Sequence, residues 1–180
     1  MDTEELRYLR EVSIPLIRQH GWIVNGFNAS TSLAGNITYT AGLTEAGVAE
    51  LAVAGLPHAP AGLLLNDAAR VHLNSELAPG MSVPTSNGVT LRVVDAPGVI
   101  GPVSRSLYGQ QVRFWQLLWP DPDGVYPDQP GWTATLHPRQ PIYTDPPTGY
   151  RPPAGDGLVG LLDHLSRRQD AAGRTPRGES

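Results

Sequence analysis

Apolar residues recur along the chain at spacings that separate helical segments from strands. Spacings of three and four residues, which are typical of an amphipathic helix, occur over 2–20 and 57–74. A shorter helix is expected over 100–108. Short alternating or continuous apolar runs bounded by Gly, Pro or Asn are typical of strands. They occur at 22–27, 37–41, 49–54, 89–94, 112–119 and 132–136.

The order of these segments predicts an α+β fold. Strands follow one another with few helices between them, so we expect a single domain with a mostly antiparallel sheet flanked by two main helices. The segment 43–48 is expected to turn, so that 37–41 and 49–54 pair as a hairpin. Pro15 removes one backbone donor inside the first helix, which predicts a kink or a break there.

After residue 119 the composition of the chain changes. The segment 120–132 is rich in Pro and Asp, which predicts an ordered loop. We assign 1–145 to one globular domain and 146–157 to a Pro/Gly-rich linker. A C-terminal amphipathic helix is predicted over 158–169, and 170–180 is expected to be a disordered tail. The apolar side of that helix carries Leu158, Leu161, Leu162 and Leu165.

The amino-acid composition excludes several kinds of chemistry. The chain has no Cys, and therefore no disulfide, thiolate nucleophile, iron–sulfur cluster or cysteine zinc site. Every basic residue is Arg, and the absence of Lys excludes Schiff-base chemistry and a lysine-anchored pyridoxal phosphate. The absence of Lys also indicates a GC-rich genome of the actinobacterial kind. We predict that the protein needs no cofactor.

Charge and hydropathy restrict the partners and the location. The net charge is -4, and no basic run precedes the Arg-containing tail, so no nucleic-acid partner is expected. No apolar run approaches the roughly 18 residues that span a bilayer. The charged first residues are unlike a signal peptide. These features predict a cytoplasmic protein with a small-molecule ligand and no membrane partner, and they are compatible with a homodimer.

A series of short fragments, taken in order, resembles a known family. The fragments are HGW at 20–22, YTAGL at 39–43, ELAVAGL at 50–56, LLN at 64–66, YG at 108–109, VR at 112–113, QL at 116–117 and WPD at 119–121. Over about 20–142 the chain is similar to the mainly actinobacterial domain-of-unknown-function family 4262. The resemblance implies no established reaction, cofactor or partner.

Some positions depart from the family pattern. Ala49 replaces the Pro that usually precedes Glu50, and Asp128 stands where a Trp is usual. Ile-Thr stands at 37–38 in place of Phe-Ala. These departures indicate a changed or specialised pocket.

Three side chains are candidates for acid–base catalysis. Tyr39 either transfers a proton in a pocket or hydrogen-bonds within the core. Glu50 begins an apolar strand, where burial would raise its pKa and suit proton transfer, whereas an edge position would leave it solvated. His137 follows the Trp-rich strand, although Pro138 beside it also favours a role in a turn.

A second set is expected to bind the substrate. Arg113 lies among aromatic residues, where its guanidinium binds a carboxylate, stacks on a ring or pairs with a structural acid such as Asp121. The other candidates supply hydroxyl, amide or aromatic groups: Thr40, Trp115, Gln116, Trp119, Tyr126 and Trp132. No metal site is predicted, because the sequence has no HExxH motif and its Asp-rich loop lacks the EF-hand spacing.

Two functions fit these residues. The first is a small cofactor-independent enzyme that acts on a small organic molecule by acid–base chemistry, such as cyclisation, dehydration, isomerisation or hydrolysis. A role in actinobacterial specialised metabolism fits this hypothesis. The alternative is a non-catalytic module that binds a small molecule or another protein. An enzyme is expected to enclose converging polar groups, whereas a module is expected to expose its aromatic residues.

Overall fold

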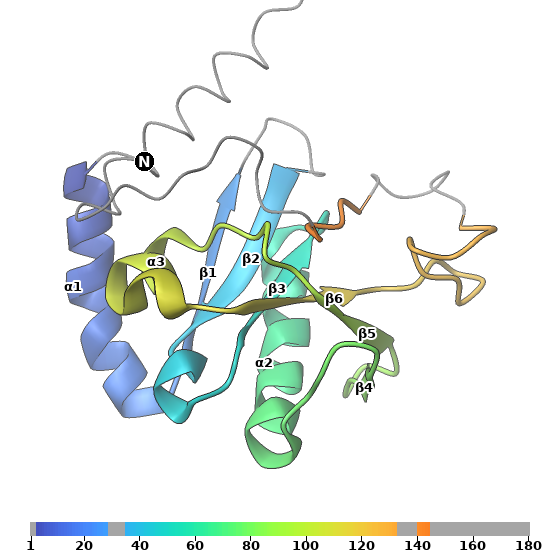
Figure 1. Cartoon of the computed structure of the whole chain (residues 1–180), viewed down its shortest axis with the longest axis horizontal. Helices are drawn as coiled ribbons and strands as arrows, with labels where there is room; N and C mark the ends of the chain where they lie inside the picture. Colours follow the sequence, from blue (N-terminus) through green and yellow to red (C-terminus); the bar gives the residue numbers. More distant parts are fainter. Residues whose placement is uncertain (1–2, 29–34, 133–139, 145–180) are drawn as a thin grey trace, which may run out of the picture.

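The computed structural model describes residues 3–28, 35–132 and 140–144. These residues form an α+β domain with a six-stranded sheet (Figure 1). The strands are β1 (Ile23–Asn28), β2 (Asn36–Ala41), β3 (Glu50–Ala54), β4 (Ser82–Pro84), β5 (Thr90–Asp95) and β6 (Phe114–Leu118). The helices are α1 (Thr3–His20), α2 (His58–Ser75) and α3 (Pro102–Tyr108), with 3₁₀ turns η2 (Leu43–Ala46) and η3 (Gly109–Gln111).

The strand order is β1-β2-β3-β6-β5-β4, and neighbouring strands are antiparallel except for the central pair. The strands β3 and β6 run parallel, with Glu50 opposite Phe114 and Ala52 opposite Gln116. A parallel pair needs a long crossover connection, which here comprises α2, the β4–β5 hairpin and α3. The predicted fold class and the hairpin formed by β2 and β3 are confirmed.

Side-chain alternation along the strands fills two separate hydrophobic cores. Leu51 and Val53 of β3 face α2, whereas Ala52 between them packs on the side of α1 and α3. The apolar stripe of α2 is buried as predicted, with Ala61, Leu64, Leu65 and Ala68 in the core. The sheet is therefore the middle layer, with α2 on one face and α1 and α3 on the other.

The structure adds one strand that the sequence does not predict, and it shows no break at Pro15. The short strand β4 was not predicted, because only one of its three residues, Val83, is buried and gives an apolar signal. The helix α1 continues through Pro15 without a break. Pro15 and Glu11, four residues earlier, are both exposed, so water can solvate the carbonyl group that loses its hydrogen bond.

Several predictions lie outside the described residues. They concern most of the strand at 132–136, the linker at 146–157, the helix at 158–169, the tail at 170–180 and the catalytic candidate His137. Within the described ranges, no helix is long and apolar enough to cross a membrane.

Candidate ligand-binding site

A groove of about 750 Å³ lies between three parts of the fold. One wall is formed by Pro60, Leu63 and Leu64 of α2, and the opposite wall is the loop 119–126. The turn between β4 and β5, residues 87–90, closes the third side. The volume lies within the range that is usual for small-molecule sites, and the lining is mainly apolar and aromatic. We call this cavity the α2 groove.

Trp119 is fixed in the wall of the α2 groove. It follows β6 directly, and its indole Nε1 donates to the carbonyl oxygen of Ala54 at 3.1 Å. Its backbone N–H donates to Oε1 of Gln140 at 3.3 Å. The ring is only 6% exposed, so it presents a small apolar surface while most of it packs in the α2-side core. A ligand would meet a rigid aromatic surface here.

The predicted Asp/Pro loop is held by its first carboxylate. Oδ1 of Asp121 accepts hydrogen bonds from the backbone N–H groups of Asp123 at 3.0 Å and Val125 at 2.9 Å. The backbone N–H of Gly124 donates to the carbonyl of Asp121 at 3.0 Å. Asp121 is therefore a turn residue, and its buried carboxylate shapes the groove. Among the described residues, no group of three or more His, Asp or Glu is arranged to hold a metal ion.

Tyr126 ties the same loop to the sheet. Its hydroxyl donates to the carbonyl of Thr90 at 2.9 Å, and its ring lies 6.0 Å from the guanidinium carbon of Arg92. Arg92 also pairs with Asp128 at 3.2 Å. These contacts hold the loop 119–128 against β5. The loop wall of the groove is therefore fixed at Trp119 and again at Tyr126.

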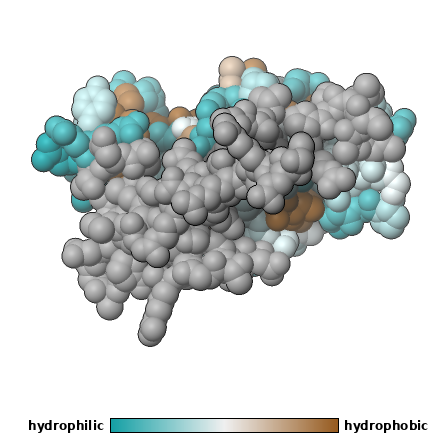
Figure 2. All heavy atoms as spheres, turned by 90° about the horizontal axis from the view of Figure 1, so that it is seen from above, coloured by the Kyte–Doolittle hydropathy of each residue, from teal (hydrophilic) through white to brown (hydrophobic). Residues whose placement is uncertain are grey.

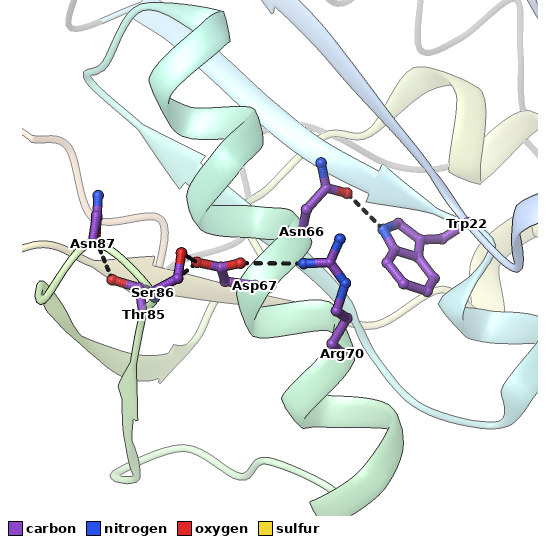
Figure 3. A network of polar contacts seen from close by, with 7 residues as sticks. All are labelled: Trp22, Asn66, Asp67, Arg70, Thr85, Ser86 and Asn87. Carbon is purple, nitrogen blue, oxygen red and sulfur yellow. Dashed lines mark hydrogen bonds and ion pairs between the residues drawn. The ribbon is translucent and has the colours of Figure 1, made fainter.

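The β4–β5 turn is held to α2 by a hydrogen-bond network (Figure 3). Oδ2 of Asp67 accepts from the backbone N–H of Ser86 at 2.9 Å and from its hydroxyl at 2.5 Å. Arg70 approaches Oδ1 of Asp67 at 3.2 Å. The hydrogen bonds from Ser86 lower the pKa of Asp67 below its usual value. We call the contact between Asp67 and Ser86 the hairpin latch.

We expect Asp67→Ala to release the hairpin latch. Hydrogen exchange at the Ser86 amide should become at least about tenfold faster, because the amide loses an acceptor worth about 1.4 kcal/mol or more. In the wild type, protection should fall as the pH drops through the lowered pKa of Asp67, because the latch contributes stability only above it. Arg70→Gln is the control, since the Arg70 side chain is 65% exposed. Equal exchange in Asp67→Ala and wild type would contradict the latch.

Glu50 is fully buried at the start of β3, and both of its carboxylate oxygens accept hydrogen bonds. Oε2 accepts from the hydroxyl of Thr40 at 2.7 Å. Oε1 accepts from the backbone N–H groups of Gly42 and Thr44, both at 3.0 Å, and from the Thr44 hydroxyl at 2.8 Å. Burial raises the pKa of Glu50, and these hydrogen bonds oppose the rise. The carboxylate therefore ties the η2 turn to the sheet.

Tyr39 lies in the other core, between Phe27 and Phe114, with both ring centroids at 6.1 Å. Its hydroxyl accepts a hydrogen bond from the backbone N–H of Val103 at 3.1 Å, at the start of α3. Burial raises the pKa of the phenol above its usual value. Neither Tyr39 nor Glu50 lines the α2 groove.

The remaining predicted residues fall in different places. The rings of Trp115 and of His72 in α2 have centroids 4.8 Å apart, and Arg113 is exposed in the residue before β6. Gln116 is buried, and it donates to the carbonyl of Pro141 at 2.6 Å while accepting from the N–H of Tyr143 at 2.9 Å. Trp132 is half-buried at the end of the described loop. Of the predicted substrate-binding residues, the groove includes only two, Trp119 and Tyr126.

Two parts of the groove were not predicted. Leu63 is the first of three consecutive leucines, and it is 68% exposed whereas Leu65 is fully buried. Three successive residues of a helix cannot all face one core, so this run was a signal for an exposed leucine. The groove residues Asn87 and Gly88 belong to a Ser-Asn-Gly segment, which the sequence identifies as a turn. The sequence does not indicate that this turn lies beside α2.

Comparison with known proteins identifies a family. The profile of the family described as domain of unknown function (DUF4262) matches residues 16–133. No curated protein and no solved structure matched the chain. The matched region contains every described residue of the groove, and it extends over most of the chain. The chain therefore belongs to the DUF4262 family.

Proposed function

We propose that the protein binds a small, mostly apolar organic molecule in the α2 groove, as a binding module. The observation that carries this proposal is the exposure of Leu63, which leaves 68% of its surface uncovered at the rim of an apolar cavity. An apolar ligand would bury this side chain against Trp119 and Tyr126. Burying a leucine side chain contributes about 1.5–3 kcal/mol to the binding free energy, so the site favours apolar ligands.

The polar groups of the groove favour binding over acid–base chemistry. The carboxylate of Asp121 and the hydroxyl of Tyr126 already hold the loop through hydrogen bonds. The carboxamide oxygen of Asn87 accepts from Thr85 and Val89, and its NH₂ group points away from Thr85 (Figure 3). Asn87 is exposed, so water hydrates this NH₂ group, and the residue brings no acid or base to the groove.

The other predictions about function stay predictions. Two of the three acid–base candidates, Tyr39 and Glu50, do not line the α2 groove, and the third, His137, lies outside the described residues. The cytoplasmic location, the actinobacterial origin and the role in specialised metabolism rest on the sequence alone.

The binding proposal is tested with a matched pair of substitutions on α2. Leu63→Asp places a charge in the groove, whereas Leu73→Asp changes a leucine that is 40% exposed on the same helix and outside the groove. With the apolar dye anilinonaphthalene sulfonate as a probe, we expect Leu63→Asp to weaken binding by at least about tenfold, from the lost burial of one leucine. Leu73→Asp should bind as the wild type does. Equal binding by all three proteins would show that the groove is not the site.

A further inference from the structure

One side of α1 carries an apolar surface that the described chain does not cover. Tyr8, Val12 and Leu16 are 63%, 38% and 44% exposed, and each lies four residues after the previous one. Residues at this spacing lie above one another on a helix. We call them the α1 stripe. Figure 2 shows hydrophobic atoms between hydrophilic ones at the left end of the molecule, where α1 lies in Figure 1.

The α1 stripe is an extension of the core-facing side of the helix. Leu6 and Ile17 are almost completely buried, and Leu9, which lies between them and the stripe on the helix surface, is partly buried in the same cluster. The polar side of α1 carries Arg7 and Glu11, which approach each other at 3.9 Å. The apolar arc of α1 is thus wider than the contact it makes with the sheet and α3, and a second apolar surface would complete its burial.

The chain leaves the described region on the same face of the sheet as α1. Tyr143 packs against the cluster that contains Leu6 and Leu9. It is held there by two hydrogen bonds, from its N–H to the side-chain Oε1 of Gln116 at 2.9 Å and from the N–H of Gly98 to its carbonyl at 3.0 Å. Whatever follows Thr144 therefore starts on the side of the sheet that carries the α1 stripe.

We propose that the leucine side of the C-terminal segment, Leu158 to Leu165, packs on the α1 stripe. The sequence places Leu158, Leu161, Leu162 and Leu165 at helical spacing, so they would form a stripe of their own. At 1.5 Å per residue, each stripe extends over about 11–12 Å of helix. The two apolar surfaces therefore match in kind and in length.

The connection reaches this surface easily. The predicted Pro/Gly-rich linker over 146–157 spans about 37 Å when extended at about 3.1 Å per residue, whereas α1 itself is about 27 Å long. A tether of this length gives the segment an effective concentration on the order of millimolar. A second copy of the chain at micromolar concentration cannot compete with that, so the segment of the same chain is the favoured occupant.

The absence of native cysteine makes a direct test possible. In the full-length chain, Val12→Cys is combined with Leu161→Cys, two positions near the middle of their stripes, so that the test works for either direction of packing. On mild oxidation with copper phenanthroline, we expect a disulfide within one chain. The matched control combines Glu11→Cys, on the polar side of α1, with the same Leu161→Cys. The in-chain disulfide should form at least about tenfold faster in the first pair than in the control, as an ordered contact requires.

Other results would overturn the proposal. Disulfides that form only between chains would assign the α1 stripe to a second copy. Equal rates in the two pairs would mean that the segment does not rest on the stripe. A second measurement does not depend on the double-cysteine variants. It compares Val12→Cys alone with Val12→Cys that also carries Leu161→Asp and Leu165→Asp. If the segment covers the stripe, maleimide should label the thiol faster in the second protein. An unchanged labelling rate would also count against the contact.

Discussion

Glu50→Ala is expected to lower the free energy of unfolding by roughly 2–6 kcal/mol, because it leaves one buried and one partly buried N–H group without their acceptor. These are the backbone N–H groups of Gly42 and Thr44, which both donate to Oε1 in the wild type. The hydroxyl of Thr40 also loses its 2.7 Å contact with the carboxylate. Urea unfolding followed by far-ultraviolet circular dichroism measures this change.

Glu50→Gln should cost less, about 1–3 kcal/mol, because one acceptor oxygen remains and the buried charge is removed. Its effect should also depend on pH. Burial raises the pKa of Glu50 above its ordinary value of 4.5. A raised folded-state pKa adds stability that is fully present below the unfolded pKa and is lost as the pH rises through the folded pKa. The wild type should therefore lose stability in that window, so the destabilisation caused by Gln should shrink as the pH rises.

Glu45→Gln is the control for both substitutions at Glu50. Glu45 lies in η2, the turn that Glu50 holds, but it is exposed, and it accepts a hydrogen bond from the hydroxyl of Tyr108 at 2.9 Å. We expect a change within about 0.5–1 kcal/mol. If Glu50→Gln were as stable as Glu45→Gln at every pH, the carboxylate of Glu50 would not be what holds the η2 turn.

Gly42→Ala is expected to be similarly destabilising, for a steric reason. Gly42 has φ 128°, a conformation that favours glycine, and an added Cβ would lie 2.5 Å from the carbonyl oxygen of Gly21 and 2.7 Å from Cα of Trp22. Backbone strain and the forced displacement of the chain together cost about 2–6 kcal/mol. A fall in the melting temperature, measured by calorimetry, would register this loss.

Gly47→Ala separates the two causes. Gly47 also has a positive φ, 82°, but an added Cβ would meet no atom within 4 Å. Only the conformational cost remains, about 1 kcal/mol. Similar losses in Gly42→Ala and Gly47→Ala would mean that the chain around Gly21 can move away, and that the close approach at Gly42 is not a fixed feature of the fold.

The fold could be predicted where the pattern of apolar residues is local. The strands β2, β3 and β6 and the helix α2 have continuous or periodic apolar runs, so they were recognised within one or two residues of their ends. The hairpin of β2 and β3 was recognised because a short turn separates the two strands. The insertion of β6 beside β3 was not predicted, because no local pattern encodes a pairing between residues that are more than 60 positions apart.

The candidate site could be predicted only in part, because burial depends on tertiary contacts. Trp119 and Tyr126 were singled out as aromatic residues near an unusual loop, and both line the α2 groove. Tyr39 and Glu50 were singled out as polar groups on apolar strands, and the sequence left a core role open for Tyr39. The structure adds their partners, a backbone N–H for Tyr39 and four donors for Glu50.

The central position of β6 has a consequence for synthesis on the ribosome. The strand β3 has β2 on one side from the time it emerges, but its other side stays open until β6 has been translated, more than 50 residues later. During that interval the nascent chain presents an unpaired edge with apolar residues on both faces. Such an edge is a template for pairing with other chains. We therefore expect the nascent chain to be most prone to aggregation in the period between translation of β3 and of β6.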